Sequence, residues 1–197
     1  YKWVGPSGAS VEAGEDYPLD LSAFPNRKKV LVTCGTQLAW AKDNLIFQAK
    51  QLAKAHTDFH FFVTRGVGGE PFQCENLMEN LSLVSYLPYK EYIPQMDYVI
   101  HHGGAGIFYQ CIIYGKPALI LPHDYDQFDY AVRGVEAGVA YTAKRDNSKE
   151  IGQAFDRLLA KENWTELENL RQVVQSYHPT EILEGEIHRL LATKEKE

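Results

Sequence analysis

The residues with the clearest capacity for chemistry form a short glycine-rich stretch, HHGGAG, at residues 101–106. An apolar run, DYVIHH, leads into it, and an expected helix over Gly106 to Tyr114 follows it. Glycines at such a junction let the backbone approach a ligand closely, and the free amides at a helix start favour a phosphate or diphosphate. His102 can donate a hydrogen bond to the same anion. A tight turn without a ligand is the alternative interpretation, because glycine turns are common.

This loop differs from the two best-known phosphate-binding motifs. GxGxxG is expected after the first strand of a dinucleotide fold, whereas the first expected strand of this chain ends in Cys-Gly-Thr. No GxxxxGK[ST] stretch occurs in the sequence. The missing GxGxxG argues against a nicotinamide-dependent oxidoreductase.

A second polar group, Asp124-Tyr125-Asp126-Gln127, stands ahead of a helix expected over Gln127 to Ala137. Asp126 is suited to cap this helix, and that role does not exclude a contact with a ligand. The DxD spacing is also that of a divalent-cation site. We expect no metal there, because the glycine loop and the helix start already supply positive potential, and no His/Cys spacing predicts zinc.

Alternating apolar runs and amphipathic stretches predict the elements that position these residues. They predict an α/β fold, a Rossmann-like doubly wound parallel sheet of about six strands with helices on both faces. In such sheets ligands bind beyond the carboxyl ends of the strands, where Gly35, Thr36 and the glycine loop are expected. The chain is expected to end in three helices, two of which begin at capping pairs, Asn147 with Glu150 and Thr165 with Glu168. The expected strands lie at residues 28–35, 59–64, 81–86, 97–102, 117–122 and 138–143, and a further helix at 43–55.

Length and composition set the limits of the fold. The chain has 197 residues, of which 45 % are hydrophobic and 23 % charged, which excludes disorder, collagen and coiled coil. Residues 1–28 are rich in proline and glycine and are expected to be an interdomain connector or arm, with a single domain over residues 29–197. The start without methionine favours an excised domain.

Charge and cysteine usage restrict the partners and the compartment. A formal charge of −6 argues against a nucleic-acid partner and against a general anionic-membrane surface. No apolar run has the roughly 20 residues that span a bilayer, and no signal peptide is seen, so we expect a cytoplasmic protein. The cysteines Cys34, Cys74 and Cys111 are odd in number and lack CxxC spacing, so we expect them to be reduced and buried.

The stretch from Tyr86 to Ala140 resembles the donor-binding half of GT-B glycosyltransferases that use nucleotide sugars, the macrolide, sterol, rhamnosyl and UDP-sugar type. The matching features are a Pro-Tyr after an aromatic residue, the HHGGAG loop, a Gly-Lys-Pro before the next strand, and the Asp-Gln pair ahead of a helix. The first strand with Gly35 and Thr36 is similar as well. The resemblance covers nearly the whole chain but only half of such an enzyme, since the acceptor-binding half is missing.

The resemblance implies a role for each matched position. The donor sugar would be held by Asp126 and Gln127, and the base and ribose by Tyr86, Leu87, Gln110 and Arg65. His101 is expected to be structural, because side chains alternate along a strand and His101 then faces away from His102. Ile107 departs from the Thr or Ser of many relatives, so backbone amides must contribute more. The diphosphate would be held by His102, Gly103, Gly104, Ala105, Gly106, Ile107, Gly35 and Thr36.

The resulting hypothesis is the donor-binding domain of an inverting, metal-independent glycosyltransferase that uses a UDP- or dTDP-sugar, with no cofactor. The base that deprotonates the acceptor is expected in the missing half, so no catalytic base is assigned here, and the isolated chain is expected to bind nucleotide with little or no turnover. Two alternatives stay open, a natural donor-binding subunit that works with a partner in trans and a nucleotide-sugar epimerase of similar architecture. The sequence does not indicate the acceptor, the oligomeric state or any membrane association.

Overall fold

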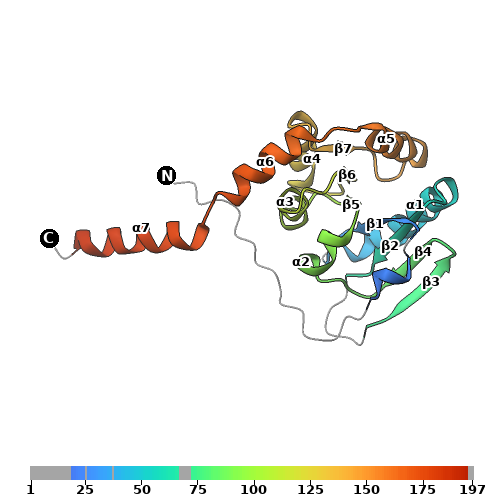
Figure 1. The fold of residues 1–197 in the computed structure, drawn as a ribbon, viewed down its shortest axis with the longest axis horizontal. Coiled ribbons are helices and arrows are strands. Elements are labelled where there is room, and N and C mark those ends of the chain that lie inside the picture. Colours follow the sequence, from blue (N-terminus) through green and yellow to red (C-terminus); the bar gives the residue numbers. More distant parts are fainter. Residues whose placement is uncertain (1–18, 25, 37, 67–71, 195–197) are drawn as a thin grey trace.

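The structure is a computed structural model that describes residues 19–24, 26–36, 38–66 and 72–194 (Figure 1). Residues 1–18 of the expected connector lie outside the described residues. The strands are β1 (Lys28–Thr33), β2 (Phe59–Thr64), β3 (Cys74–Met78), β4 (Leu81–Val84), β5 (Tyr98–His101), β6 (Ala118–Ile120) and β7 (Ala140–Thr142). The α-helices are α1 (Lys42–Ala55), α2 (Tyr89–Tyr92), α3 (Ala105–Ile113), α4 (Gln127–Glu136), α5 (Ser148–Ala160), α6 (Thr165–Gln175) and α7 (Pro179–Lys194). Single 3-10 turns lie at η1 (Leu21–Ala23), η2 (Ala39–Ala41) and η3 (Ile93–Gln95).

The strands form one sheet in the order β3-β4-β2-β1-β5-β6-β7. All neighbouring pairs are parallel except β3 with β4. The chain builds the sheet outward from β1 in one direction through β2 and β4, and then crosses to β5 and builds outward in the other direction. This reversal places a topological switch point between β1 and β5, which is where doubly wound folds bind ligands.

Alternation along the strands divides the core between the two faces of the sheet. Val30 and Val32 of β1 pack with α1 and α5, whereas Leu31 between them packs with α3, α4 and α6. All three side chains are buried. Helices therefore cover both faces, as the near-continuous apolar strands predict (Figure 1).

The sheet has seven strands rather than the six expected, and the additional one is the antiparallel edge strand β3. Cys74, Glu75 and Asn76 at its start are exposed, so the segment lacks the apolar run that identifies a buried strand. An edge strand needs only one paired side and tolerates polar residues. The predicted doubly wound parallel sheet is therefore confirmed, with one antiparallel strand added at this edge.

Of the two predicted helix caps, one is confirmed and one is wrong. Asn147 accepts a hydrogen bond from the Glu150 amide at 3.1 Å, as an N-cap should. Thr165 does not cap α6 but is its first residue. The Asn163 carboxamide oxygen accepts hydrogen bonds from both the amide and the hydroxyl of Thr165, at 2.9 and 2.5 Å.

Residues before β1 lie against the domain. Leu21 is buried in the same cluster as Phe62, and the Phe24 ring centroid lies 4.1 Å from that of His60. The Leu19 amide donates to the Tyr92 hydroxyl at 3.2 Å. The last stretch of the expected connector thus contributes side chains to the core.

The three cysteines are free. Cys34 and Cys111 are buried as expected, but Cys74 is exposed, because it lies on the edge strand that the sequence did not predict. Within the described ranges, no helix is both long and apolar enough to cross a membrane.

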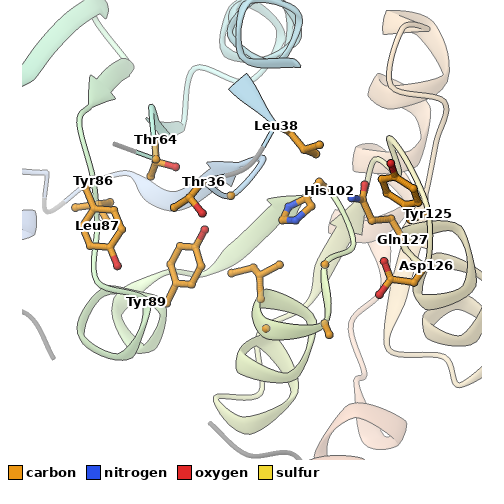
Figure 2. Close-up of a pocket in the computed structure, with 16 residues that line it drawn as sticks. Thr36, Leu38, Thr64, Tyr86, Leu87, Tyr89, His102, Tyr125, Asp126 and Gln127 are labelled. Atoms are coloured by element: carbon orange, nitrogen blue, oxygen red, sulfur yellow. The ribbon is translucent and has the colours of Figure 1, made fainter. Parts of the chain in front are cut away.

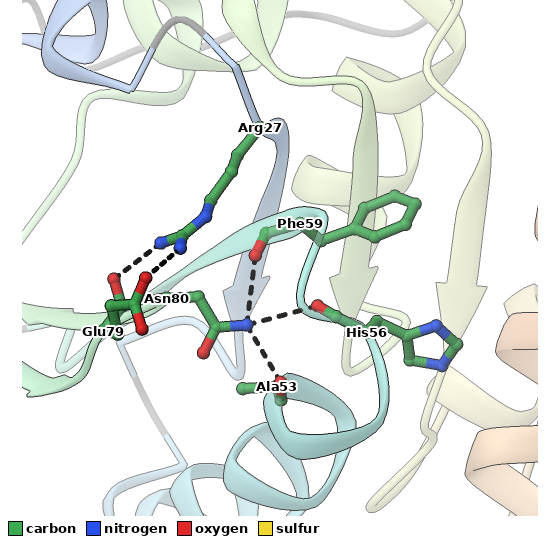
Figure 3. Close-up of polar contacts among 6 residues, drawn as sticks. All are labelled: Arg27, Ala53, His56, Phe59, Glu79 and Asn80. Carbon is green, nitrogen blue, oxygen red and sulfur yellow. Dashed lines mark hydrogen bonds and ion pairs between the residues drawn. The ribbon is translucent and has the colours of Figure 1, made fainter.

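Asn80 joins the turn before β4 to the end of α1 and the start of β2 (Figure 3). Its side-chain nitrogen lies 2.9 Å from the Ala53 carbonyl oxygen and 3.2 Å from those of His56 and Phe59. Asn80 is 5 % exposed. The Ala53 carbonyl belongs to the end of a helix, where intrahelical partners are lacking, and the His56 carbonyl also accepts from the Phe59 amide at 3.3 Å, so the Asn80 side chain adds a donor to the end of α1.

We expect Asn80→Asp to lower the free energy of unfolding by more than Asn80→Ala, which itself should cost about 1–3 kcal/mol. Aspartate would place a carboxylate against three carbonyl oxygens, whereas alanine only removes the donor that they share. Urea denaturation measures both values. Asn163→Asp is the matched control, because aspartate caps a helix as well as asparagine does and should leave stability almost unchanged. An equal cost for Asn80→Asp and Asn163→Asp would contradict this role.

Candidate functional site

A cleft of about 480 Å³ opens at the carboxyl ends of the strands around the switch point (Figure 2). Most of the predicted site residues meet there. Gly35, Thr36, His102 and residues 104–107 line it, and so do Tyr86 and Leu87 on the predicted base side. Asp126 and Gln127 line the predicted sugar side. Residues that follow β1, β4, β5 and β6 are thus brought to one cavity, as the strand order requires.

His102 is held between two glycine backbones. A Cβ atom on Gly104 would lie 2.5 Å from His102 Nε2, and one on Gly35 would lie 3.0 Å from His102 Cε1. Glycine at these positions leaves the imidazole ring its present place beside the backbone, and Gly35 also has φ +71°, which favours glycine. The pKa of His102 is lowered to about 4, chiefly by burial and also by nearby His123, so the ring is neutral near pH 7.

The first turn of α3 presents free amides beside this ring. Gly104 is the N-cap residue and has no side chain to bond them, and the Phe108 amide is the one that donates to its carbonyl oxygen, at 3.0 Å. The amides of Ala105, Gly106 and Ile107 precede that bond and therefore lack intrahelical acceptors. Among the described residues lining the cleft none is lysine or arginine, so positive potential here comes from the helix start.

His101 faces away from the cleft and anchors the loop, consistent with the structural role expected of it. Its ring is fully buried, and Nδ1 accepts a hydrogen bond from the Gly103 amide at 3.0 Å. Gly103 has φ +92°, and a Cβ there would lie 2.9 Å from the Gln127 carbonyl oxygen. The Gly103 amide is already bonded to His101, and this residue does not line the cleft, so its predicted contact with a diphosphate stays a prediction.

The predicted sugar-side loop is shaped by Gln127. Its side-chain oxygen accepts hydrogen bonds from the amides of His123 at 2.9 Å and Asp124 at 3.1 Å, which leaves its side-chain nitrogen as the group available to a ligand. Asp126 precedes α4 but makes no capping hydrogen bond, so its exposed carboxylate is free to accept from hydroxyls. Tyr125 beside it has φ +49° and is 85 % exposed.

Two further predicted residues lie away from the cleft. The Arg65 side chain is 49 % exposed and forms an ion pair with Glu75 of β3 at 3.4 Å, a partner that the sequence could not indicate while β3 was missed. Gln110 lies one turn along α3 and is half-buried, with no hydrogen-bond partner for its side-chain oxygen in the described part of the chain. Neither side chain lines the cavity.

The sequence prediction missed Thr64 and Tyr89, which line the cleft, and Thr33, which lies behind it. Thr33 and Thr64 are the last residues of β1 and β2, and these strands pair in parallel with Val32 opposite Val63. Polar residues at the carboxyl ends of two adjacent strands were therefore the available signal. Tyr89 was part of the quoted Pro-Tyr motif but received no role.

No cluster of three or more His, Cys, Asp or Glu side chains able to hold a metal ion occurs in the part of the chain that the structure describes. Asp124 and Asp126 therefore stand without a third ligand of these types. What the cleft offers a ligand is a set of neutral donors beside one carboxylate.

Comparison with known proteins agrees with this geometry. Residues 68–187 match the family described as "Erythromycin biosynthesis protein CIII-like, C-terminal domain". The "Uncharacterized UDP-glucosyltransferase YdhE" of Bacillus subtilis is 24 % identical over 190 residues, which are 95 % of this chain and 47 % of the relative. The glycotransferase of kitacinnamycin superposes with a TM-score of 0.77 at 20 % identity over 95 % of this chain and 48 % of that one. VinC, solved in complex with dTDP, has a TM-score of 0.66 at 23 % identity, over 83 % of this chain and 41 % of that one.

These matches identify the class of the domain. The fold is that of the Rossmann-like C-terminal half of a GT-B glycosyltransferase. The chain belongs to the family of EryCIII-like C-terminal domains. It spans about half the length of the relatives it matches.

The buried histidine behind the glycine loop makes stability depend on pH. Burial, together with nearby His102, lowers the pKa of His101 to about 3, whereas an unfolded histidine titrates near 6.5. Between these values the unfolded chain binds a proton that the native chain does not, so stability is lost as pH falls below 6.5. Protonation would also remove the acceptor for the Gly103 amide.

In His101→Asn, the unfolding free energy should fall less steeply as the pH is lowered from 6 to 5. The slope should decrease by about 1.4 kcal/mol per pH unit, which corresponds to the uptake of one proton fewer on unfolding. The asparagine oxygen can accept from the Gly103 amide but does not titrate. Urea unfolding at pH 7, 6 and 5 measures the slope. His188→Asn on α7, where the side chain is exposed, is the control. An unchanged slope in His101→Asn would show that this ring is not the titrating group.

Proposed function

We propose that this domain binds the nucleoside-diphosphate sugar of an inverting, metal-independent glycosyltransferase that uses a UDP- or dTDP-sugar. The observation that carries the proposal is the pairing of free α3 amides with His102 in one cleft that also holds the Asp126 carboxylate. Membership of the EryCIII-like family supports transferase activity, and relatives named for UDP and solved with dTDP support these two donors.

In the proposed reaction an acceptor hydroxyl attacks the anomeric carbon while the bond from that carbon to the diphosphate oxygen breaks. The sugar is transferred with inversion, and the nucleoside diphosphate leaves with additional negative charge. The amides of Ala105, Gly106 and Ile107 are positioned to stabilise that charge, and His102 can add a hydrogen bond. The electrostatic role of a divalent ion is thereby assigned to the helix start, which is why we propose metal independence.

Sugar recognition is assigned to the loop before α4. The Asp126 carboxylate can accept from a pair of sugar hydroxyls, and the Gln127 side-chain nitrogen can donate to one. The base that removes the acceptor proton is assigned to a second domain, in the same chain or in a partner, because this chain spans only about half of its relatives. A cytoplasmic location stays a prediction.

Calorimetric titration with UDP and dTDP, with and without chelator, tests donor binding. We expect binding that survives the chelator and becomes about tenfold weaker or more in His102→Ala, the effect of losing one hydrogen bond to a charged acceptor. His188→Ala is the matched control, since that residue lies far from the cleft on α7. Binding that disappears with the chelator would overturn metal independence, and equal affinity in His102→Ala would remove His102 from the site.

The chain alone is expected to show no sugar transfer above the uncatalysed rate, because no base for the acceptor is assigned to it. Transfer from a UDP- or dTDP-sugar to a panel of alcohols, followed by release of nucleoside diphosphate, measures this. Adding the acceptor-binding half of a relative should raise the rate if the interface is compatible. A steady transferase rate from the chain alone would contradict the placement of the base.

A further inference from the structure

Three hydroxyl groups from three elements meet behind the cleft. The Thr33 hydroxyl oxygen lies 2.8 Å from that of Thr64 and 3.0 Å from that of Tyr89. The Gly35 amide also reaches the Thr33 oxygen, at 3.1 Å. Thr33 and Thr64 are buried, and Tyr89 lines the cleft, where its ring lies between Tyr86 and His102 in the view of Figure 2.

Counting protons fixes the direction of these hydrogen bonds. A hydroxyl group has one proton and two lone pairs. The Gly35 amide can only donate, and Thr64 donates to Thr33, so both lone pairs of the Thr33 oxygen are occupied. The Thr33 proton must then go to the Tyr89 oxygen, which accepts it.

The Tyr89 proton is consequently left without an acceptor among the described side chains and backbone groups. Among the described residues, Thr33 is the only hydrogen-bond partner of the Tyr89 hydroxyl. Burial raises the pKa of Tyr89 to about 12, so the phenol keeps its proton at neutral pH. The Tyr89 side chain is half-buried and lines the cleft, so its proton is available to a ligand oxygen there.

We propose that Tyr89 donates a hydrogen bond to an oxygen of the bound nucleoside diphosphate, and that the chain Thr64–Thr33–Tyr89, the hydroxyl relay, orients its proton. The inference rests on the proposed function, since it assigns a contact to the same ligand. In Figure 2 Tyr89 lies between Tyr86 and Leu87 on one side and His102 on the other, so ribose and phosphate oxygens are the acceptors that we assign to it. Tyr89 binds the ligand, and Thr33 and Thr64 are positioning residues.

Tyr89→Phe tests the contact, because it removes the hydroxyl and keeps the ring. We expect UDP to bind about tenfold more weakly, as for the loss of one hydrogen bond to a charged acceptor. Tyr92→Phe is the matched control, since Tyr92 is a buried tyrosine whose hydroxyl contacts Leu19 rather than the cleft. Repeating the titration with 2′-deoxy-UDP separates the two acceptors. If Tyr89 contacts the ribose 2′-hydroxyl, Tyr89→Phe should weaken the binding of UDP but leave the binding of 2′-deoxy-UDP unchanged.

Thr64→Val tests the relay. Without the Thr64 proton, a lone pair on Thr33 becomes free and Tyr89 can turn its own proton back onto it. We expect a weakening of about threefold in Thr64→Val, recovery in Thr64→Ser, and no additional loss when Thr64→Val is combined with Tyr89→Phe. A loss in the double variant equal to the product of the single losses would overturn the relay.

The outcomes separate this inference from the proposed function. If wild type binds UDP and Tyr89→Phe binds it equally well, the inference is wrong and the proposed function stands. If wild type binds neither UDP nor dTDP, the proposed function fails and the inference fails with it. Thermal unfolding of each variant confirms that it is folded at the temperature of the titration.

Discussion

The site depends on one electrostatic feature. The amides at the first turn of α3 have no intrahelical acceptors and are available to an anion. The described residues that line the cleft include one formal charge, the negative Asp126, and His102 is neutral near pH 7. An anion can therefore be stabilised here only by oriented neutral donors and the helix dipole. These backbone donors are fixed before the ligand arrives, so their own contacts require no side chain to become ordered.

The fold holds this loop in place because neighbouring side chains at the end of β5 point to opposite sides. His101 faces the sheet interior and holds the Gly103 amide, while His102 faces the cleft. The same loop thus has one histidine that positions the backbone and another that is available to a ligand. The glycine at position 104 is required because the His102 ring occupies the space of its Cβ. Stability and binding are linked here, since protonation of His101 would remove the acceptor that fixes the loop.

Much of the fold and of the site could be predicted from the sequence, because both depend on local patterns. Buried parallel strands are apolar along their length, and a glycine loop between a strand and a helix is visible without any tertiary information. Strand β3 escaped prediction because an exposed edge strand has no such pattern. The hydroxyl relay could not be predicted, because it depends on the pairing of β1 with β2 and on the position of Tyr89 beside them. Neither is visible in the local spacing of residues. The ion pair of Arg65 could not be predicted for a related reason, since its partner Glu75 lies on the missed strand.

The most direct test of the central claim is an amide-resolved NMR titration of the ¹⁵N-labelled chain with UDP in the presence of chelator. The account predicts that the amides of Ala105, Gly106 and Ile107 undergo the largest shifts, while the Gly103 amide, which is already bonded to His101, shifts less. Saturable shifts elsewhere on the domain, with the first turn of α3 unchanged, would show that these amides do not hold the diphosphate and would contradict the account.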